Sequence, residues 1–135
     1  MTVSLKSIGA LSLFVEDPQV SKAFYRQVFD VSVVFEDEYS VVVEFDNTIV
    51  NLLKSSAAHE LIEPAMVAEP DIGHRFQLTV WVDDVDAAVV DLRARGVTLL
   101  NGPMDRVWGQ RTASFEDPDG TIWEIAQQIA GPGPT

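Results

Sequence analysis

The sequence predicts an α+β fold made of two βαβββ repeats. Residues 10–17, Ala-Leu-Ser-Leu-Phe-Val-Glu-Asp, match residues 77–84, Gln-Leu-Thr-Val-Trp-Val-Asp-Asp. In both segments apolar residues alternate with other residues, which is the period of a strand with two different faces. Each segment is followed by apolar residues at helical spacing and then by three β-rich runs. A match between two distant parts of one chain indicates a structural unit that is used twice.

The first repeat spans residues 7–54. Its helix is predicted by apolar residues three and four positions apart, which lie on one side of a helix. These residues are Val20, Ala23, Phe24 and Val28. Pro18 suits the first turn of that helix, where its missing N–H costs nothing. The three β-rich runs are residues 31–35, 40–45 and 48–53, with Asp46-Asn47 as the turn between the last two.

The second repeat spans residues 74–128. Its helix is predicted by Val85, Ala88, Val89 and Leu92, and we expect it to end at Gly96, because glycine accepts the left-handed conformation found at helix ends. Its β-rich runs are residues 97–100, 111–115 and 121–127. The turn Asp117-Pro118-Asp119-Gly120 precedes the last run. This repeat carries about six extra residues, which the pattern places in a loop at residues 101–110.

The single predicted domain, residues 1–135, also contains a segment between the two repeats and one after the second repeat. Residues 55–73 contain two prolines and mix acidic with small residues, which is typical of a linker, with one short helical turn around residues 60–66. Residues 129–135 end in Gly-Pro-Gly-Pro-Thr and are expected to be a disordered tail.

Composition and charge exclude several kinds of partner. The 135 residues carry a formal net charge of −12, so we expect no binding to nucleic acid or to an anionic membrane surface. The same acidity serves solubility or attracts a cationic ligand. Because no apolar run approaches the roughly 20 residues that cross a bilayer, we expect a cytoplasmic protein. The chain has no cysteine, and it lacks the sequence patterns of a nucleophile elbow, a phosphate loop and a dinucleotide fingerprint.

Three ordered motifs resemble the vicinal oxygen chelate superfamily, which includes glyoxalases, bleomycin-resistance proteins and extradiol dioxygenases. They are Val15-Glu16-Asp17 leading to Ser21-Lys22-Ala23-Phe24-Tyr25, Val82-Asp83-Asp84-Val85-Asp86 leading to Ala94-Arg95-Gly96-Val97, and Trp108-Gly109-Gln110-Arg111 leading to Asp117-Pro118-Asp119-Gly120-Thr121-Ile122-Trp123-Glu124. The resemblance implies two four-stranded, strongly curved mixed sheets around a cleft that binds a small molecule. It also implies a homodimer.

The resemblance further implies four metal-ligand positions in metal-dependent members. Here they are Ala10, Asn51, Gln77 and Glu124. Transition metals in such sites take histidine and carboxylate ligands, whereas this set has one anion, two neutral amides and an alanine. His74 lies an odd number of positions from Gln77, and His59 lies in the linker. We therefore expect no tightly bound cofactor, with a weak divalent metal at Gln77 and Glu124 as the alternative.

Several residues are candidates for binding the small molecule. The mixed faces of the two matching strands contribute Ser12, Phe14, Gln77, Thr79 and Trp81, and other segments contribute Asn51, Trp108, Arg111 and Glu124. Phe14 and Trp81 offer a stacking surface for a planar ligand or fill the floor of the sheet. Arg111 reaches an anionic group or pairs with a surface carboxylate. Glu124 is a hydrogen-bond acceptor, and a candidate catalytic base if a substrate proton comes within reach.

These candidates lead to three hypotheses about function. The first is a metal-independent protein of the bleomycin-resistance type that binds an amphipathic or aromatic molecule in the cleft. The second is a metal-dependent glyoxalase-like lyase or isomerase, or a dioxygenase. The third is a dimeric module that acts only through protein contacts. The incomplete ligand set favours the first hypothesis.

Overall fold

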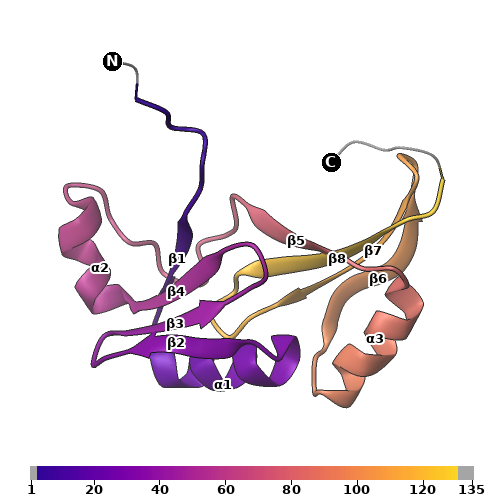
Figure 1. The fold of residues 1–135 in the computed structure, drawn as a ribbon. Helices are drawn as coiled ribbons and strands as arrows, with labels where there is room; N and C mark the ends of the chain where they lie inside the picture. The colour runs from indigo at the N-terminus through magenta and orange to yellow at the C-terminus, as the bar shows by residue number, and fades with distance from the viewer. Residues whose placement is uncertain (1–2, 131–135) are drawn as a thin grey trace. The chain divides into compact units, whose positions relative to one another are not determined.

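The computed structural model describes residues 3–130 and confirms the α+β fold with two βαβββ repeats. The chain forms two compact units that divide between Glu69 and Pro70, and each unit holds one repeat with its own four-stranded sheet (Figure 1). Within the described residues, no helix is long and apolar enough to span a membrane.

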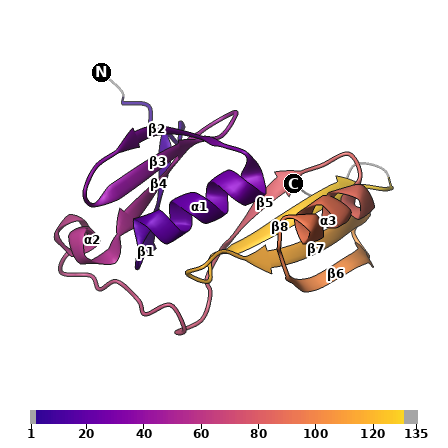
Figure 2. The ribbon, with the colours of Figure 1, turned by 90° about the horizontal axis from the view of Figure 1, so that it is seen from below.

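The first unit contains one four-stranded mixed sheet and two helices. Its elements are β1 (Ala10–Val15), α1 (Pro18–Phe29), β2 (Ser32–Glu36), β3 (Ser40–Glu44), β4 (Ile49–Lys54) and α2 (Ser55–Ile62). The strand order is β1-β4-β3-β2, with β1 parallel to β4 and the other pairs antiparallel. The Asp17 carboxylate caps α1 by accepting from the Gln19 N–H at 2.9 Å. The helix then packs across β3 and β4 and buries Tyr25 and Val28 (Figure 2).

The second unit repeats this arrangement. Its elements are β5 (Gln77–Trp81), α3 (Val85–Ala94), β6 (Leu99–Arg106), β7 (Gln110–Glu116) and β8 (Ile122–Gln128), in the strand order β5-β8-β7-β6. Asp84 caps α3 through the Ala87 N–H at 3.1 Å. The turn before β8 is held by Asp117, whose Oδ1 accepts from the N–H groups of Asp119 and Thr121.

The sheet of the second unit has two different faces, and this decides which side chains meet. α3 packs on β6, β7 and β8. The face below α3 holds the core, which comprises Val85, Val89 and Leu92 of the helix with Ala113, Phe115, Trp123 and Ile125 of the sheet. Trp123 is therefore a core residue. This was predicted from its place next to Glu124 on one strand, because adjacent side chains of a strand point to opposite faces. The other side of the sheet is called here the helix-free face, and its residues are those that alternate with the core positions on each strand.

Three sequence-based boundaries were wrong. The helix predicted as one turn at residues 60–66 is α2, which begins at Ser55 and ends at Ile62. The predicted loop at residues 101–110 is largely strand, because β6 continues to Arg106 through two register shifts against β7. The predicted tail begins later than residue 129, since the N–H groups of Ile129 and Ala130 donate to the Gly109 carbonyl. The rest of that tail, residues 131–135, lies outside the described residues.

Candidate functional site

The helix-free face of the second unit brings three predicted site residues together. Thr79 on β5 and Glu124 on β8 are register partners, and the Thr79 hydroxyl donates to Glu124 Oε1 at 3.0 Å. Gln77 lies two positions before Thr79, so that it shares this face. Gln77 and Thr79 are exposed, and Glu124 is half-buried. Around Glu124 the sheet therefore presents a carboxylate that is oriented by a hydroxyl, with neutral polar groups beside it. Glu116, the register partner of Ile122, is a second carboxylate on this face, at the exposed end of β7.

The neighbouring strands continue this polar face with residues that sequence reasoning did not identify. Ser114 on β7 is the register partner of Glu124, and Thr112 is the partner of Ala126. Arg106, at the end of β6, extends over Thr112 and donates from Nε to the Thr112 hydroxyl at 2.9 Å. Its Nη2 donates to Asn101 Oδ1 at 3.4 Å. The missed signal was the alternation of polar residues in β7, which puts Thr112 and Ser114 on the face of Glu124.

Two tryptophans that were predicted to bind the small molecule, Trp81 and Trp108, lie on or beside the helix-free face. Trp81 is the register partner of Ala126, so it is on the helix-free face, and it is 50% exposed. Trp108 is 46% exposed and follows β6 in the turn to β7. Its indole N–H donates to Gln110 Oε1 at 3.1 Å, and the Arg106 guanidinium carbon lies 6.0 Å from its ring centroid. Both rings offer apolar surface to a ligand at little cost in ordering.

In the first unit, the other predicted residues lie on the face opposite α1. Ser12 of β1 and Asn51 of β4 are register partners, and Phe14 is the partner of Leu53. Phe14 is half-buried and Ser12 is exposed. The Oδ1 atom of Asn51 is buried and has no hydrogen-bond partner among the described residues. A buried acceptor without a partner is uncommon and marks a place where a ligand donor or water is accommodated.

Among the predicted site residues on the strands of the second unit, Arg111 is the one that does not lie on the helix-free face. On β7 it alternates with Thr112 and pairs with Asp105 of β6. Its guanidinium donates to Asp105 Oδ1 at 2.7 Å and to Asp86 Oδ2 of α3 at 3.1 Å. Both interactions are on the side of the sheet that α3 covers. Arg111 therefore forms surface ion pairs, which was the second of its two predicted roles.

This ion pair gives a testable pH effect. The hydrogen bond from Arg111 holds the pKa of Asp105 below its ordinary value of 3.8. The folded protein thus binds this proton less readily than the unfolded chain, so that the pair stabilises the fold above about pH 4 and the contribution is lost as the pH falls through the folded pKa. In a carboxyl-carbon NMR titration, we expect Asp105 to titrate below 3.8 and to move upward toward that value in Arg111→Gln. An unchanged midpoint in the variant would contradict this account.

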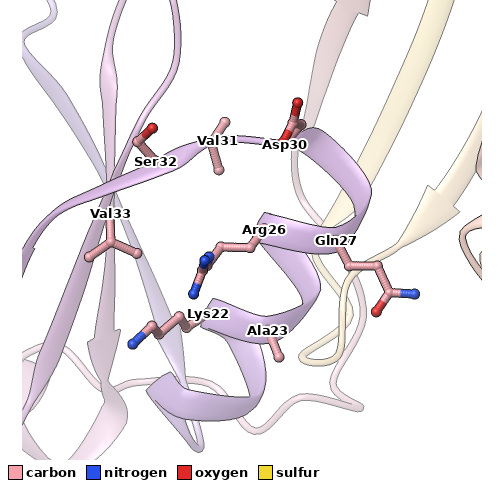
Figure 3. A pocket seen from close by; sticks show the side chains of 8 residues that line it. All are labelled: Lys22, Ala23, Arg26, Gln27, Asp30, Val31, Ser32 and Val33. Carbon is pink, nitrogen blue, oxygen red and sulfur yellow. The ribbon is translucent and has the colours of Figure 1, made fainter.

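The first unit also has an open hollow of about 730 Å³ between α1 and β2 (Figure 3). Lys22 and Arg26 extend from the same side of α1 into it. Lys22, however, forms an ion pair with Glu36 at 2.8 Å, and Gln19 donates to the same carboxylate at 2.7 Å. These contacts hold the pKa of Glu36 below its ordinary value. The charges in the hollow are thus partly neutralised, and none of the predicted site residues lines it.

The donor set does not fit a tightly bound transition metal. Within residues 3–130, no group of three or more histidine, aspartate or glutamate side chains is placed to hold a metal ion. Of the four positions that the resemblance implies, Ala10 has no donor atom, and Asn51 and Gln77 offer neutral oxygens. Glu124 is the one anion, and one of its oxygens already accepts from Thr79. Such sites require about three strong protein donors.

Comparison with known proteins supports this fold and identifies the family of the chain. Residues 7–125 match the family model described as Glyoxalase/Bleomycin resistance protein/Dioxygenase superfamily. The uncharacterized protein YraH of Bacillus subtilis (strain 168) is 31% identical over 123 residues, which cover 88% of this chain and 96% of that protein. The chain therefore belongs to the Glyoxalase/Bleomycin resistance protein/Dioxygenase superfamily, which confirms the resemblance to the vicinal oxygen chelate proteins.

Solved structures show the same fold. A glyoxalase/bleomycin resistance protein/dioxygenase from Nocardioides superposes with a TM-score of 0.87 at 28% identity, covering 99% of this chain and 91% of that chain. A lactoylglutathione lyase from Agrobacterium tumefaciens superposes with a TM-score of 0.69 at 20% identity, covering 91% and 94%. The second likeness is one of fold alone.

Proposed function

We propose that this protein binds a small amphipathic or aromatic molecule on the helix-free face of the second unit, without a tightly bound metal. The observation that carries the proposal is the composition of this face. It combines the carboxylate of Glu124 with hydroxyl and amide groups and with two half-exposed tryptophans. Ligand sites in proteins commonly pair apolar aromatic surface with a few fixed polar groups.

The alternative function is that of a metal-dependent glyoxalase-like lyase or isomerase, or a dioxygenase. The family to which the chain belongs favours it, because the description of that family includes glyoxalases and dioxygenases. The donor set weighs against it, because within residues 3–130 no group of three or more histidine, aspartate or glutamate side chains is placed to hold a metal ion. The homodimer implied by the family resemblance is part of the proposal, and sedimentation tests it, since a monomer at micromolar concentration would contradict it.

The proposal predicts the outcome of metal titration. We expect that calorimetry of the metal-stripped protein with Ni²⁺, Zn²⁺, Mn²⁺ and, anaerobically, Fe²⁺ shows no submicromolar binding. The measurement is made beside Glu124→Ala and beside Glu60→Ala, which removes an exposed glutamate from α2 as a control for charge. Submicromolar binding that is lost only in Glu124→Ala would overturn the metal-free proposal, and lyase and dioxygenase assays would follow.

A ligand screen tests the binding function itself. Since Trp81 and Trp108 are half-exposed, a ligand on this face should change the tryptophan fluorescence of the metal-stripped protein. We expect binders among small aromatic or amphipathic molecules, with affinities that do not change when a metal is added. A requirement for added metal would support the alternative function instead.

A further inference from the structure

Arg106 differs from the ion-pairing cations Lys22 and Arg111 in the groups that hold it. Its Nε donates to the Thr112 hydroxyl at 2.9 Å and its Nη2 to the Asn101 amide oxygen at 3.4 Å. The third neighbour is the Trp108 ring, whose own N–H is held by Gln110. All three partners are neutral. They fix the orientation of the guanidinium but leave its charge uncompensated.

The charge of Arg106 stands out among the half-buried cations of the chain, which are Lys22, Arg106 and Arg111; the other six basic residues are exposed. The protein has 21 acidic and nine basic residues. Lys22 pairs with Glu36, and Arg111 pairs with both Asp86 and Asp105. Within residues 3–130, by contrast, no carboxylate lies within ion-pair distance of Arg106, although its side chain is half-buried. A half-buried cation with neutral partners is stabilised by an anion from outside the chain.

The remaining donors of Arg106 suit a planar anion. A guanidinium has five N–H groups in a fixed fork, and two of them are used by Thr112 and Asn101. The other three are available for two parallel hydrogen bonds to a carboxylate. Because neighbouring contacts already restrict the side chain, little conformational entropy is lost when these bonds form.

Glu124 limits which other charged or polar groups the ligand can have. Thr112 and Glu124 are diagonal neighbours on β7 and β8, since Thr112 pairs with Ala126 and Ser114 with Glu124. Diagonal neighbours lie about 7–8 Å apart. Because the Arg106 guanidinium is held at the Thr112 hydroxyl, the cation and the Glu124 carboxylate extend from neighbouring positions on the same face, within the span of one small molecule. A phosphate, with its second negative charge, is less suitable beside Glu124 than a carboxylate.

We propose that Arg106 binds the carboxylate of a small organic acid whose hydroxyl or amino group donates to Glu124 and whose apolar body lies against Trp108. This inference rests on the proposed function, because it names the chemical class of the ligand for the same face. The net charge of −12 opposes an anionic ligand only weakly at this site. Charges farther away than about 8 Å are largely screened at physiological salt. Arg106, by contrast, would contact the ligand carboxylate directly, so its attraction is not screened in this way.

The test uses the metal-stripped full-length protein and a panel of small 2-hydroxy and 2-amino acids with aliphatic or aromatic bodies. Each acid is titrated beside its neutral amide, and phenyl phosphate is included, with tryptophan fluorescence as the readout. We expect acids of this panel to bind about 10- to 100-fold more tightly than their amides, because a neutral amide cannot form the charged hydrogen bonds that a carboxylate forms with Arg106. Phenyl phosphate should bind more weakly than the carboxylate with the same ring.

Three variants separate recognition by Arg106 from a general effect of charge. Arg106→Gln should lose most of the preference for acid over amide, and Arg106→Lys, which keeps the charge without the fork, should fall between Arg106→Gln and the original protein. Arg111→Gln removes the same charge from the helix-covered side and should keep the full preference. A thermal melt of each variant checks that the fold is retained.

Four results would overturn the inference. Amides that bind as well as their acids would do so, as would an acid preference that survives in Arg106→Gln or is lost equally in Arg111→Gln. Absence of binding by every acid at millimolar concentration is the fourth. If neutral aromatic molecules bind while acids do not, the proposed function stands and only the role of Arg106 is wrong. Submicromolar metal binding, measured separately, would instead contradict the proposed function.

Discussion

Replacing Phe115 by alanine is expected to lower the free energy of unfolding by about 3–5 kcal/mol. Phe115 is fully buried on β7, where its register partners are Trp123 of β8 and Leu99 of β6. The ring lies on the face that α3 covers, so truncation leaves a cavity that the three strands cannot close without breaking their hydrogen bonds. The loss is a large fraction of the total of roughly 5–15 kcal/mol that is usual for a domain.

Urea unfolding followed by circular dichroism measures this effect. Phe76→Ala is the matched control, because Phe76 precedes β5 in the same unit and is 59% exposed. A substitution at such a surface position is expected to change stability by about 0.5 kcal/mol or less. Phe115→Leu, which keeps most of the apolar volume, should lose less than Phe115→Ala. Equal losses for Phe115→Ala and Phe76→Ala would mean that the core of the second unit lies elsewhere.

The repeats could be predicted from the sequence because the pattern of each strand depends on neighbouring residues alone. Alternation in residues 10–15 and 77–81 placed β1 and β5 correctly, and the spacing of Val85, Val89 and Leu92 placed α3. The same parity rule put Trp123 in the core and Glu124 on the other face. These inferences need no knowledge of which strands pair.

Predictions failed where the structure depends on pairing between strands. Gly102 and Pro103 interrupt the pattern of β6, and such residues within a strand normally indicate a loop or a bulge. Here they accompany register shifts, after which β6 resumes and carries Arg106 back onto the sheet. The prediction of a loop therefore concealed Arg106. Similarly, the face on which Arg111 lies follows from the register of β7 against β8, which the turn at residues 117–121 sets.

The composition of α2 explains the remaining boundary error. The helix contains two serines and two alanines at its start, and Ala58 is its one buried residue. A helix with so small an apolar face gives almost no periodic signal. The mixed segment was therefore interpreted as a linker, although the Ser55 hydroxyl ties its first residue to the Val15 carbonyl of β1 at 3.1 Å.

Gly102→Ala is expected to destabilise the protein by about 3 kcal/mol, through two separate effects. Gly102 has φ of +86°, which a residue with a Cβ adopts only at a cost. In addition, its Cβ would lie 2.5 Å from the Thr112 carbonyl oxygen and 2.8 Å from Ala113 Cα. Both neighbours are backbone atoms of β7, so no side-chain rotation relieves the clash. Either β6 or β7 must move.

Two other glycines separate these effects. Gly73 has φ of +115° with nothing within 4 Å of the added Cβ, so Gly73→Ala measures the backbone cost alone, about 1–2 kcal/mol. Gly9 has open space without a left-handed φ, and Gly9→Ala should be neutral or slightly stabilising. Chemical unfolding of the three variants should therefore rank Gly102→Ala as the least stable. If Gly102→Ala loses no more than Gly73→Ala, the strands are not as close as the structure places them.

The close approach at Gly102 also links stability to the proposed ligand face. Gly102 lies next to Asn101, and the strand that it contacts carries Thr112, so the two neutral groups that orient Arg106 are both adjacent to the clash. Any shift of β6 against β7 changes the distances from Arg106 to these groups. We therefore expect Gly102→Ala to weaken binding of the acid panel even at temperatures where it is folded, whereas Gly73→Ala should bind as the original protein does. Full acid affinity in folded Gly102→Ala would show that Arg106 does not depend on this strand pairing for its orientation.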